Sequence, residues 1–332
     1  MRFGLFVPQG WRHDLVGIEP VDHWATMHAL AGYADAPDSG WESIWVYDHF
    51  HTVPVVSQTE GAHEAWTLMA AYAASTSRVR IGQMCTCMSY RNPAYLAKVA
   101  ATVDVISGGR LEMGIGGGWY EHEWRAYGYG FPPVPERLGR LREGVEIMRQ
   151  AWTTGSATLD GTYYQVDGAV VQPRPLQSGG IPIWVAGGGE QVTLKIAAKY
   201  ASYTNFTGTP EEFVHKSEVL RGHCERLGTD FAAITRSSNF NTVIGSDDAD
   251  VAARLDRIEA RLSPYLGPEK MARYLADLHA PNALVGTPSQ VAAKLAERRE
   301  LGLSYAIHYF PEAAYDRSGL ELFAREVMPA LR

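Results

Sequence analysis

The side chains best suited to proton chemistry stand together directly after an apolar run at positions 43–47. Asp48 is followed by His49, and one residue separates His49 from His51. Imidazole serves as a general acid, a general base or a metal ligand. His49 and its neighbour Asp48 are therefore candidates for proton chemistry. The alternatives are a structural hydrogen bond for His49 and a loop cap for Asp48.

His49 and His51 also form a His-x-His pair, a pattern that binds divalent metals after a strand. Such a site needs further ligands. No histidine occurs between Ile183 and Phe206, and no aspartate directly follows His308. The sequence therefore argues against a metallohydrolase, and we expect no metal.

Two glycine-rich segments provide backbone where side chains would otherwise stand. One follows an apolar run at 111–115, and the other precedes the predicted helix Gln191–Lys199. Glycine permits positive φ and close approach to a ligand, and N–H groups at such turns hold phosphate. A tight connection is the alternative for each segment. We predict that they bind a flat or phosphorylated cofactor through Gly116, Gly117, Gly118, Gly187, Gly188, Gly189 and Glu190.

Eight short apolar runs, separated by segments of helical character, must position these residues. Continuous apolar runs are typical of parallel strands covered by helices, so they predict an α/β fold, a (β/α)8 TIM barrel, with a doubly wound sheet as the alternative. In such barrels the chemistry lies where the strands end. The predicted strands are Phe3–Val7, Ser43–Tyr47, Val79–Cys85, Leu111–Ile115, Ile183–Ala186, Tyr203–Phe206, Asn239–Ile244 and Tyr305–Tyr309.

Two longer insertions interrupt this alternation near 156–181 and 262–284. The first is rich in Gly, Pro, Tyr and Gln, and the second holds Pro264, Gly267 and Pro281 around a predicted short helix. Long loops of this kind often act as lids. We predict one domain over 1–332 with these two insertions.

Composition narrows the partners. The formal net charge of -7 provides no basic patch for nucleic acid, so a small molecule is the expected partner. The chain has three cysteines, an odd number that fits a reducing compartment. It opens as a strand without a leader, and it lacks an apolar stretch long enough for a membrane span. We expect a cytoplasmic protein that does not bind membranes.

Further motifs carry a family resemblance. The chain resembles the bacterial-luciferase-like flavin and deazaflavin oxidoreductases along essentially its whole length. The resemblance implies a (β/α)8 barrel with an inserted loop region, usually a homodimer, that binds FMN or the 8-hydroxy-5-deazaflavin coenzyme F-420. The motifs are Tyr90–Pro93, Ala101–Asp104, Ser107–Arg110, Gly114–Trp119, Asp160–Tyr164, Pro173–Gln177, Ile181–Gly188 and Val285–Pro288.

Asp48 and His49 distinguish the two cofactors. Flavin members of the family carry Glu-His at this strand end, whereas deazaflavin members resemble this chain in carrying Asp-His. Coenzyme F-420 is therefore the expected cofactor, with FMN as the alternative. A deazaflavin carries a hydride and does not activate oxygen as flavin does. We expect hydride transfer to or from a carbonyl, activated alkene, imine or quinone; an FMN-dependent monooxygenase and a non-catalytic flavin-binding protein are the alternatives.

The resemblance also places His49 near the reactive edge of the ring, where it is expected to donate or relay a proton, and Asp48 is expected to orient it or to bond to the cofactor. Trp119 stands where the family's sugar-phosphate dehydrogenase has an acidic glutamate, so oxidation of glucose 6-phosphate is not expected. Trp119, with Gln9 and Trp11 after the first strand, is assigned to the substrate pocket. Nearby Glu121 and Glu123 are two residues apart, a spacing that points them away from each other on a helix, so we expect both on a solvated face.

Deazaflavin members of the family also resemble each other in a cis peptide bond that is not before proline, at the end of the third strand. Alignment places it between Met84 and Cys85, within one residue, and implies that Met84, Cys85 and Thr86 back the cofactor ring. The sequence then favours Cys85 and Cys87 as small side chains beside a crowded backbone, rather than as metal ligands or a disulfide.

Overall fold

The computed structural model describes residues 1–280 and 282–331. Parallel strands alternate along the chain with helices, which is the order of a (β/α)8 barrel, and the predicted fold class is confirmed. The chain divides into two compact units, described here one at a time. Unit 1 comprises Met1–Glu64, Phe206–His215 and Thr235–Arg332; unit 2 comprises Ala65–Asn205 and Lys216–Ile234. The single-domain organisation stays a prediction.

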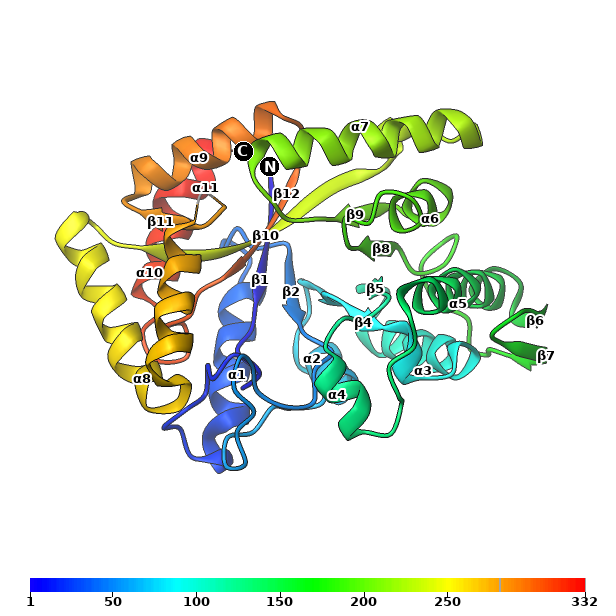
Figure 1. Ribbon diagram of the computed structural model, residues 1–332, viewed down its shortest axis with the longest axis horizontal. Helices are drawn as coiled ribbons and strands as arrows, with labels where there is room; N and C mark the ends of the chain where they lie inside the picture. Colours follow the sequence, from blue (N-terminus) through cyan, green and yellow to red (C-terminus); the bar gives the residue numbers. More distant parts are fainter. Residues whose placement is uncertain (281, 332) are drawn as a thin grey trace. The chain divides into compact units, whose positions relative to one another are not determined.

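Unit 1 contains a parallel sheet with the strand order β11–β10–β12–β1–β2. In Figure 1, β12, β1 and β2 are neighbouring strands. The strands are β1 (Arg2–Phe6), β2 (Ser43–Val46), β10 (Thr235–Ile244), β11 (Leu284–Gly286) and β12 (Tyr305–Tyr309). The helices are α1 (Pro20–Asp35), α8 (Asp248–His279), α9 (Pro288–Glu300), α10 (Ser318–Leu322) and α11 (Met328–Leu331), and α7 (Pro210–Leu227) starts in this unit.

Unit 2 contains a second run of parallel strands, in the order β3–β5–β8–β9, with β4 paired to β5. The strands are β3 (Arg80–Gln83), β4 (Thr86–Cys87), β5 (Leu111–Gly116), β8 (Ile183–Ala186) and β9 (Tyr203–Asn205). The helices are α2 (Ala65–Ser75), α3 (Pro93–Ser107), α4 (Glu121–Ala126), α5 (Val134–Thr154) and α6 (Thr193–Tyr200).

Capping residues explain the limits of α3. The Asn92 side-chain oxygen accepts hydrogen bonds from the backbone N–H groups of Ala94 and Tyr95, and Pro93 occupies the first turn. Gly108 ends the helix in the left-handed conformation with φ 69°. The motif residues at both ends of this segment therefore have a local structural role, as N-cap and C-cap.

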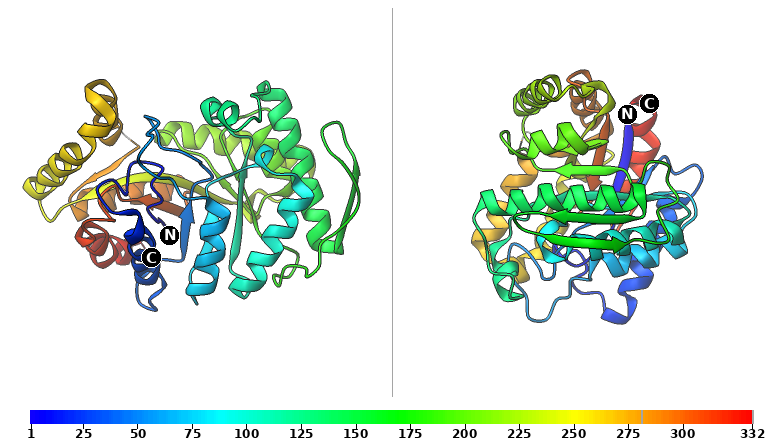
Figure 2. Two further views of the ribbon diagram at one scale, coloured as in Figure 1. Left: turned by 90° about the horizontal axis from the view of Figure 1, so that it is seen from below. Right: turned by 90° about the vertical axis from the view of Figure 1, so that its right-hand side faces the viewer.

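The first predicted insertion is not an irregular loop. It contains the antiparallel hairpin of β6 (Ser156–Asp160) and β7 (Gln165–Val170), which lies beside α5 (Figure 2). The buried carboxylate of Glu143 in α5 accepts backbone N–H bonds from Tyr163 at 2.9 Å and Tyr164 at 3.2 Å. A helix side chain thus fixes the hairpin turn, which sequence patterning does not reveal.

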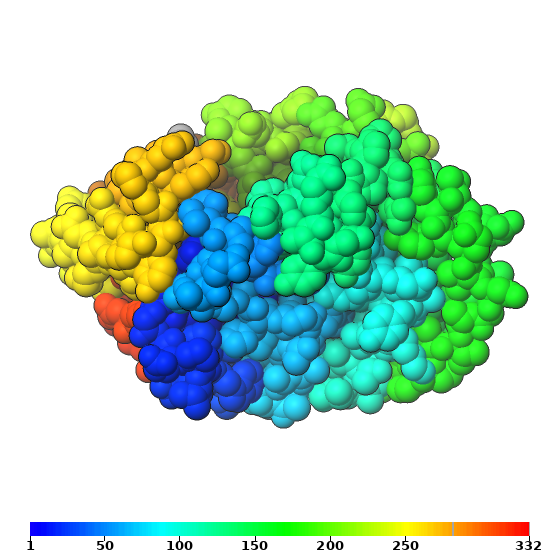
Figure 3. Space-filling view, turned by 60° about the horizontal axis from the view of Figure 1, so that its bottom comes forward, coloured from blue at the N-terminus to red at the C-terminus, as the bar shows by residue number. Residues whose placement is uncertain are grey.

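The second predicted insertion is mostly helical. Positions 262–279 form the second part of α8, whose outer surface is visible in yellow to orange in Figure 3. The helix is kinked at Gly267, where φ is 70°. Its inner face packs into an apolar cluster with Val243 of β10. The expected short helix is therefore part of a long, kinked one; Pro281 lies outside the described residues.

A buried histidine lies within the aromatic core of unit 1. His308 of β12 is fully buried, and its Nδ1 is 2.9 Å from the Thr242 hydroxyl. The ring centroid of Phe323 lies 4.4 Å away. Burial lowers the pKa of His308 to about 3, because the apolar surroundings disfavour the charged ring.

This burial predicts a pH-dependent stability. In the unfolded chain the imidazole regains its ordinary pKa of 6.5 and binds a proton that the folded protein excludes. The free energy of unfolding should therefore fall as the pH drops below 6.5, by up to about 1.4 kcal/mol per pH unit. Urea denaturation from about pH 5 to about pH 7.5 measures this slope. The slope of the free energy of unfolding against pH should be smaller in His308→Gln and unchanged in the exposed control His279→Gln. Equal slopes in the original protein and both variants would contradict the assignment of this pH dependence to His308.

Candidate active site

The end of β2 presents the predicted acid–base residues. Asp48 is buried, whereas His49 is half-buried. The His49 ring is stacked face to face on the Trp11 indole, with centroids 4.1 Å apart and an interplanar angle of 2°. The indole also contacts the Tyr47 ring at 4.3 Å. Stacking on a wide indole holds the imidazole in one plane, so His49 is an oriented side chain.

A buried amide connects the segments that follow β1 and β2. The Gln9 side-chain nitrogen donates to the backbone oxygens of Tyr47 and His63 at 2.8 and 2.6 Å, and its oxygen accepts from Tyr47 N–H. Gln9 is fully buried, and these contacts are with main chain. Gln9 therefore positions the segment that carries His49; its assignment to the substrate pocket stays a prediction.

The same two segments touch directly through their backbones. The Val53 N–H donates to the Trp11 carbonyl oxygen at 2.8 Å. Gly10 has φ 91°, and a Cβ there would stand 1.8 Å from the carbonyl oxygen of Gly61. Only glycine fits this crossing, because no side chain can occupy that space.

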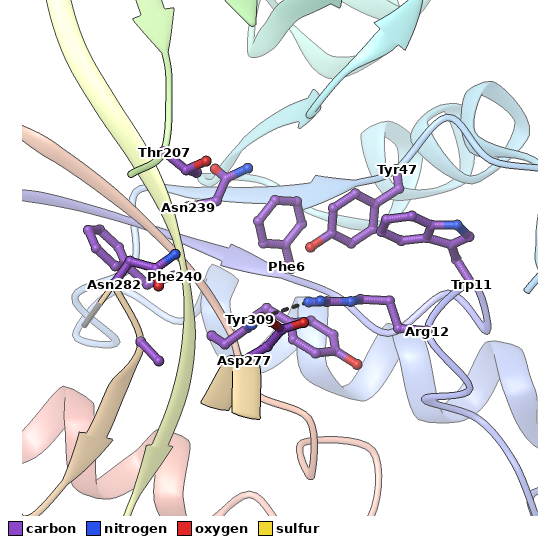
Figure 4. A pocket seen from close by; sticks show the side chains of 12 residues that line it. Phe6, Trp11, Arg12, Tyr47, Thr207, Asn239, Phe240, Asp277, Asn282 and Tyr309 are labelled. Atoms are coloured by element: carbon purple, nitrogen blue, oxygen red, sulfur yellow. Dashed lines mark hydrogen bonds between the residues drawn. The ribbon is translucent and has the colours of Figure 1, made fainter. Parts of the chain in front are cut away.

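A cavity of about 230 Å³ opens in unit 1 beside these residues (Figure 4). It lies where barrel active sites are found, at the carboxyl ends of β1, β2 and β12. Of the residues that the sequence assigns to the substrate pocket, Trp11 lines this cavity. The lining comprises Phe6, Trp11, Arg12, Tyr47, Thr207, Asn239, Phe240, Asn241, Asp277, Asn282, Ala283 and Tyr309.

Sequence analysis missed most of this lining. Arg12 and Tyr309 follow the same rule that pointed to Trp11, since they lie just after β1 and at the last position of β12. Reading every strand end equally would have found both. Asn241 lies within β10, and Asp277 lies in the last turn of α8, so neither carries a local signal.

The cavity is polar at one end. The Arg12 Nη1 donates to Asn241 Oδ1 at 2.7 Å, and the Tyr309 ring centroid is 4.4 Å from the guanidinium carbon. Burial raises the pKa of the Tyr47 hydroxyl and of the Tyr309 hydroxyl. Burial lowers the pKa of Arg12, but the neighbouring tyrosines and Asp14 outweigh this effect, so the net direction is upward. Arg12 is a permanent cation here.

In unit 2 the predicted cis peptide is present between Met84 and Cys85, at the position given by the alignment. It lies between β3 and β4, at the end of the predicted third strand. Thr86 is fully buried and donates its hydroxyl to Gln83 Oε1 at 2.7 Å. The role of Met84, Cys85 and Thr86 in backing a cofactor ring stays a prediction.

The glycine run that begins at the last residue of β5 has a local explanation. A Cβ on Gly116 would stand 2.7 Å from the Cys85 sulfur, and one on Gly118 would stand 2.6 Å from the Cys87 sulfur. The two thiols, two residues apart, thus pack against two glycines with the same spacing. Gly117 faces Leu138 instead. Close packing accounts for Gly116 and Gly118, and cofactor contact by Gly116, Gly117 and Gly118 stays a prediction.

The second glycine turn lies against a lysine that sequence analysis missed. A Cβ on Gly188 would stand 2.8 Å from Cε and 2.9 Å from Nζ of Lys216. Gly187 has φ 114°, α6 begins at Thr193, and the backbone oxygen of Glu190 bonds to a histidine, His223, at 2.7 Å. A glycine turn with an adjacent ammonium group fits an anionic phosphate. Lys216 comes 28 positions after Gly188, and nothing in the sequence links the two.

The segment after the glycine run corrects one expectation. Glu121 is exposed and pairs with Arg125, as predicted for a solvated face. Glu123 is fully buried and accepts a hydrogen bond from the Tyr90 hydroxyl at 3.2 Å, so its predicted exposure is wrong. The spacing of two puts the carboxylates on opposite faces of α4, one of which is internal. Trp119 is 63% exposed and stacks on Tyr120.

The pairing of thiols with glycines predicts a rescue experiment. Gly116→Ala should lower the free energy of unfolding by about 1–3 kcal/mol, because the new methyl group overlaps the Cys85 sulfur. Cys85→Ala should recover most of that loss in the double variant, as measured by urea denaturation. Gly118→Ala provides the contrast, since φ 76° and the nearby Trp124 ring should prevent rescue by Cys87→Ala. Additive effects at 116 and 85 would refute the packing explanation.

Neither a metal cluster nor a membrane span is found in the part of the chain that the structure describes. Residues 1–280 and 282–331 contain no group of three His, Cys, Asp or Glu placed to hold a metal ion. No helix among them is both long and apolar enough to cross a membrane.

Comparisons with known proteins match this fold. The F-420-dependent glucose-6-phosphate dehydrogenase of Kineococcus radiotolerans is 30% identical over 91% of this chain and 93% of its own. The monooxygenase RslO1 of Streptomyces bottropensis has a TM-score of 0.81 at 22% identity, with 100% of each chain covered. The coenzyme F-420-dependent tetrahydromethanopterin reductase of Methanopyrus kandleri has a TM-score of 0.78 at 20% identity, covering 100% of this chain and 99% of that one. The luciferase-like monooxygenase family model matches residues 1–305, and the chain belongs to this family.

Proposed function

We propose that this protein is an oxidoreductase that transfers a hydride between coenzyme F-420 and a small organic substrate. Family membership supports an oxidoreductase, and the name of the Kineococcus relative supports coenzyme F-420. The Asp48–His49 pair at the end of β2 agrees with that cofactor. The observation that carries the proposal is His49 held flat on Trp11, because Trp11 also lines the cavity.

The chain offers a place for the anionic end of the cofactor. Lys216 and the N–H groups of Gly187, Gly188 and Gly189 form a cationic turn suited to phosphate. When bound, the deazaflavin supplies or accepts the hydride. Met84, Cys85, Thr86 and the glycines Gly116, Gly117 and Gly118 are proposed to back the ring, with Glu190 beside the phosphate turn.

His49 is proposed to move the proton that accompanies hydride transfer. The stacked indole fixes the imidazole plane, so an imidazole nitrogen can keep one direction during the reaction. Asp48 is buried and directly precedes His49 in the sequence. It is proposed to orient this histidine or to bond to the cofactor. General acid–base catalysis by such a positioned group contributes on the order of 10² to 10⁴ in rate.

The substrate is proposed to differ from that of the sugar-phosphate relative. Trp119 replaces the acidic residue expected from the resemblance, and indole cannot transfer a proton near neutral pH. The cavity of about 230 Å³ fits a small molecule. We propose a carbonyl, activated alkene, imine or quinone as the reacting group, and no turnover with glucose 6-phosphate. The homodimer implied by the resemblance and the cytoplasmic location expected from the composition complete the proposal.

Cofactor preference gives the first test. Fluorescence titration should show coenzyme F-420 binding at least about tenfold more tightly than FMN, a difference of about 1.4 kcal/mol. Gly188→Val should weaken binding, because the new side chain collides with Lys216 and crowds the turn. Gly32→Val, where a Cβ meets nothing within 4 Å, is the matched control. Equal or reversed affinities would overturn the cofactor proposal and favour an FMN enzyme.

His49 gives the second test. His49→Ala should lower turnover by about 10² to 10⁴ while the affinity for coenzyme F-420 stays nearly constant. Turnover is followed as oxidation of the reduced cofactor with an acceptor found by screening carbonyls, activated alkenes, imines and quinones. His28→Ala on α1, whose ring stacks on Trp24, is the control. Normal turnover in His49→Ala would remove its catalytic role, and a large loss of cofactor binding would make it a positioning residue.

A further inference from the structure

The cavity in unit 1 contains one cation with an unusual set of partners. Arg12 is half-buried, and its side chain extends into the space between the rings of Tyr47 and Tyr309 in Figure 4. Its Nη1 donates to the neutral Asn241 oxygen. Among residues 1–280 and 282–331, no carboxylate lies within ion-pair distance of Arg12.

Two other arginines, the buried Arg254 and the half-buried Arg110, have different acceptors. Arg254 forms an ion pair with Glu312 at 2.6 Å and with Asp250 at 3.2 Å. Arg110 donates to backbone oxygens, including those of Val79 at 2.7 Å and Thr76 at 2.8 Å. A guanidinium group carries several donors in a planar fork. Arg12 differs from both, because its acceptors are neutral, the Asn241 oxygen and the Tyr47 hydroxyl, and because its side chain lines the cavity.

We propose that this cavity binds the carboxylate of an organic acid, with Arg12 as its charged partner. The inference rests on the proposed function in one respect, since it identifies that acid as the substrate of the oxidoreductase. The planar fork of Arg12 matches the two oxygens of a carboxylate. The Asn239 and Asn241 side chains, which line the same cavity, provide further polar contacts.

Two features favour a carboxylate over a phosphate. Asp277 lines the cavity, and the buried carboxylate of Asp14, which accepts the Gly10 N–H bond at 2.7 Å, interacts electrostatically with Arg12. These acids repel a dianion about twice as strongly as a monoanion, so a single carboxylate fits beside Arg12 better than a doubly charged phosphate. The Phe6, Trp11 and Tyr47 rings also line the cavity, so the rest of the acid is expected to be apolar or conjugated.

A matched pair of probes tests the charge requirement. Benzoate and benzamide have the same shape and differ in charge, and isothermal titration calorimetry measures both against the intact protein. Benzoate should bind at least about tenfold more tightly than benzamide and more tightly than inorganic phosphate. Equal binding of the two aromatic probes, tighter binding of phosphate, or no binding of benzoate would overturn the inference without any variant.

Variants then assign the effect to Arg12. Arg12→Gln should abolish the preference for benzoate, Arg12→Lys should retain part of it, and the exposed control Arg257→Gln should leave it unchanged. Circular dichroism confirms that each variant is folded. If Arg12→Gln keeps the full preference for benzoate, the assignment to Arg12 is wrong, whatever Arg12→Lys shows. Titration of the original protein with coenzyme F-420 separates the two proposals. If the cofactor does not bind, the proposed oxidoreductase is refuted. If benzoate and benzamide bind equally well, only the acid pocket is refuted.

Discussion

The candidate site in unit 1 depends on the hydrogen bonds of one buried amide. Gln9 uses both ends of its side chain on main-chain groups of Tyr47 and His63. Leaving any of these groups unpaired in the core would be unfavourable by about 1–3 kcal/mol. The hydrogen bonds of Gln9 therefore fix the backbone next to Asp48 and His49. Trp11, two residues after Gln9, fixes the imidazole by stacking on its ring. The orientation of the candidate proton donor follows from this arrangement.

The barrel could be predicted from sequence because parallel strands covered by helices are apolar along their whole length. The same logic fails for β6 and β7. Their residues are largely exposed, and their turn is held by Glu143, which is presented by a helix that precedes them. Glu123 was misjudged for a related reason, since its burial depends on Tyr90, more than thirty positions earlier. Neither partner can be read from local periodicity.

The candidate site also divides into residues that the local sequence indicates and residues that depend on distant parts of the chain. Strand ends are visible in the sequence, so Asp48, His49, Trp11 and both glycine segments can be chosen as candidates from it. Lys216 and Asn241 reach their positions through tertiary packing, and no pattern near them indicates it. The glycine run had two physical explanations, and the structure supplies one of them, because the Cys85 and Cys87 sulfur atoms occupy the space beside Gly116 and Gly118. A glycine required by close packing against a neighbouring strand and a glycine required by contact with a ligand look the same in a sequence.

The crossing at Gly10 has a consequence for how this pocket can diversify. The segments after β1 and β2 are joined by the Val53–Trp11 backbone hydrogen bond, and Gly10 lies against the Gly61 carbonyl with no space for a methyl group. A change of length or course in one segment would collide with the other or break their shared hydrogen bonds. The two therefore behave as one module for inheritance and for engineering: grafting a new specificity from a related barrel should require both segments to be transferred together.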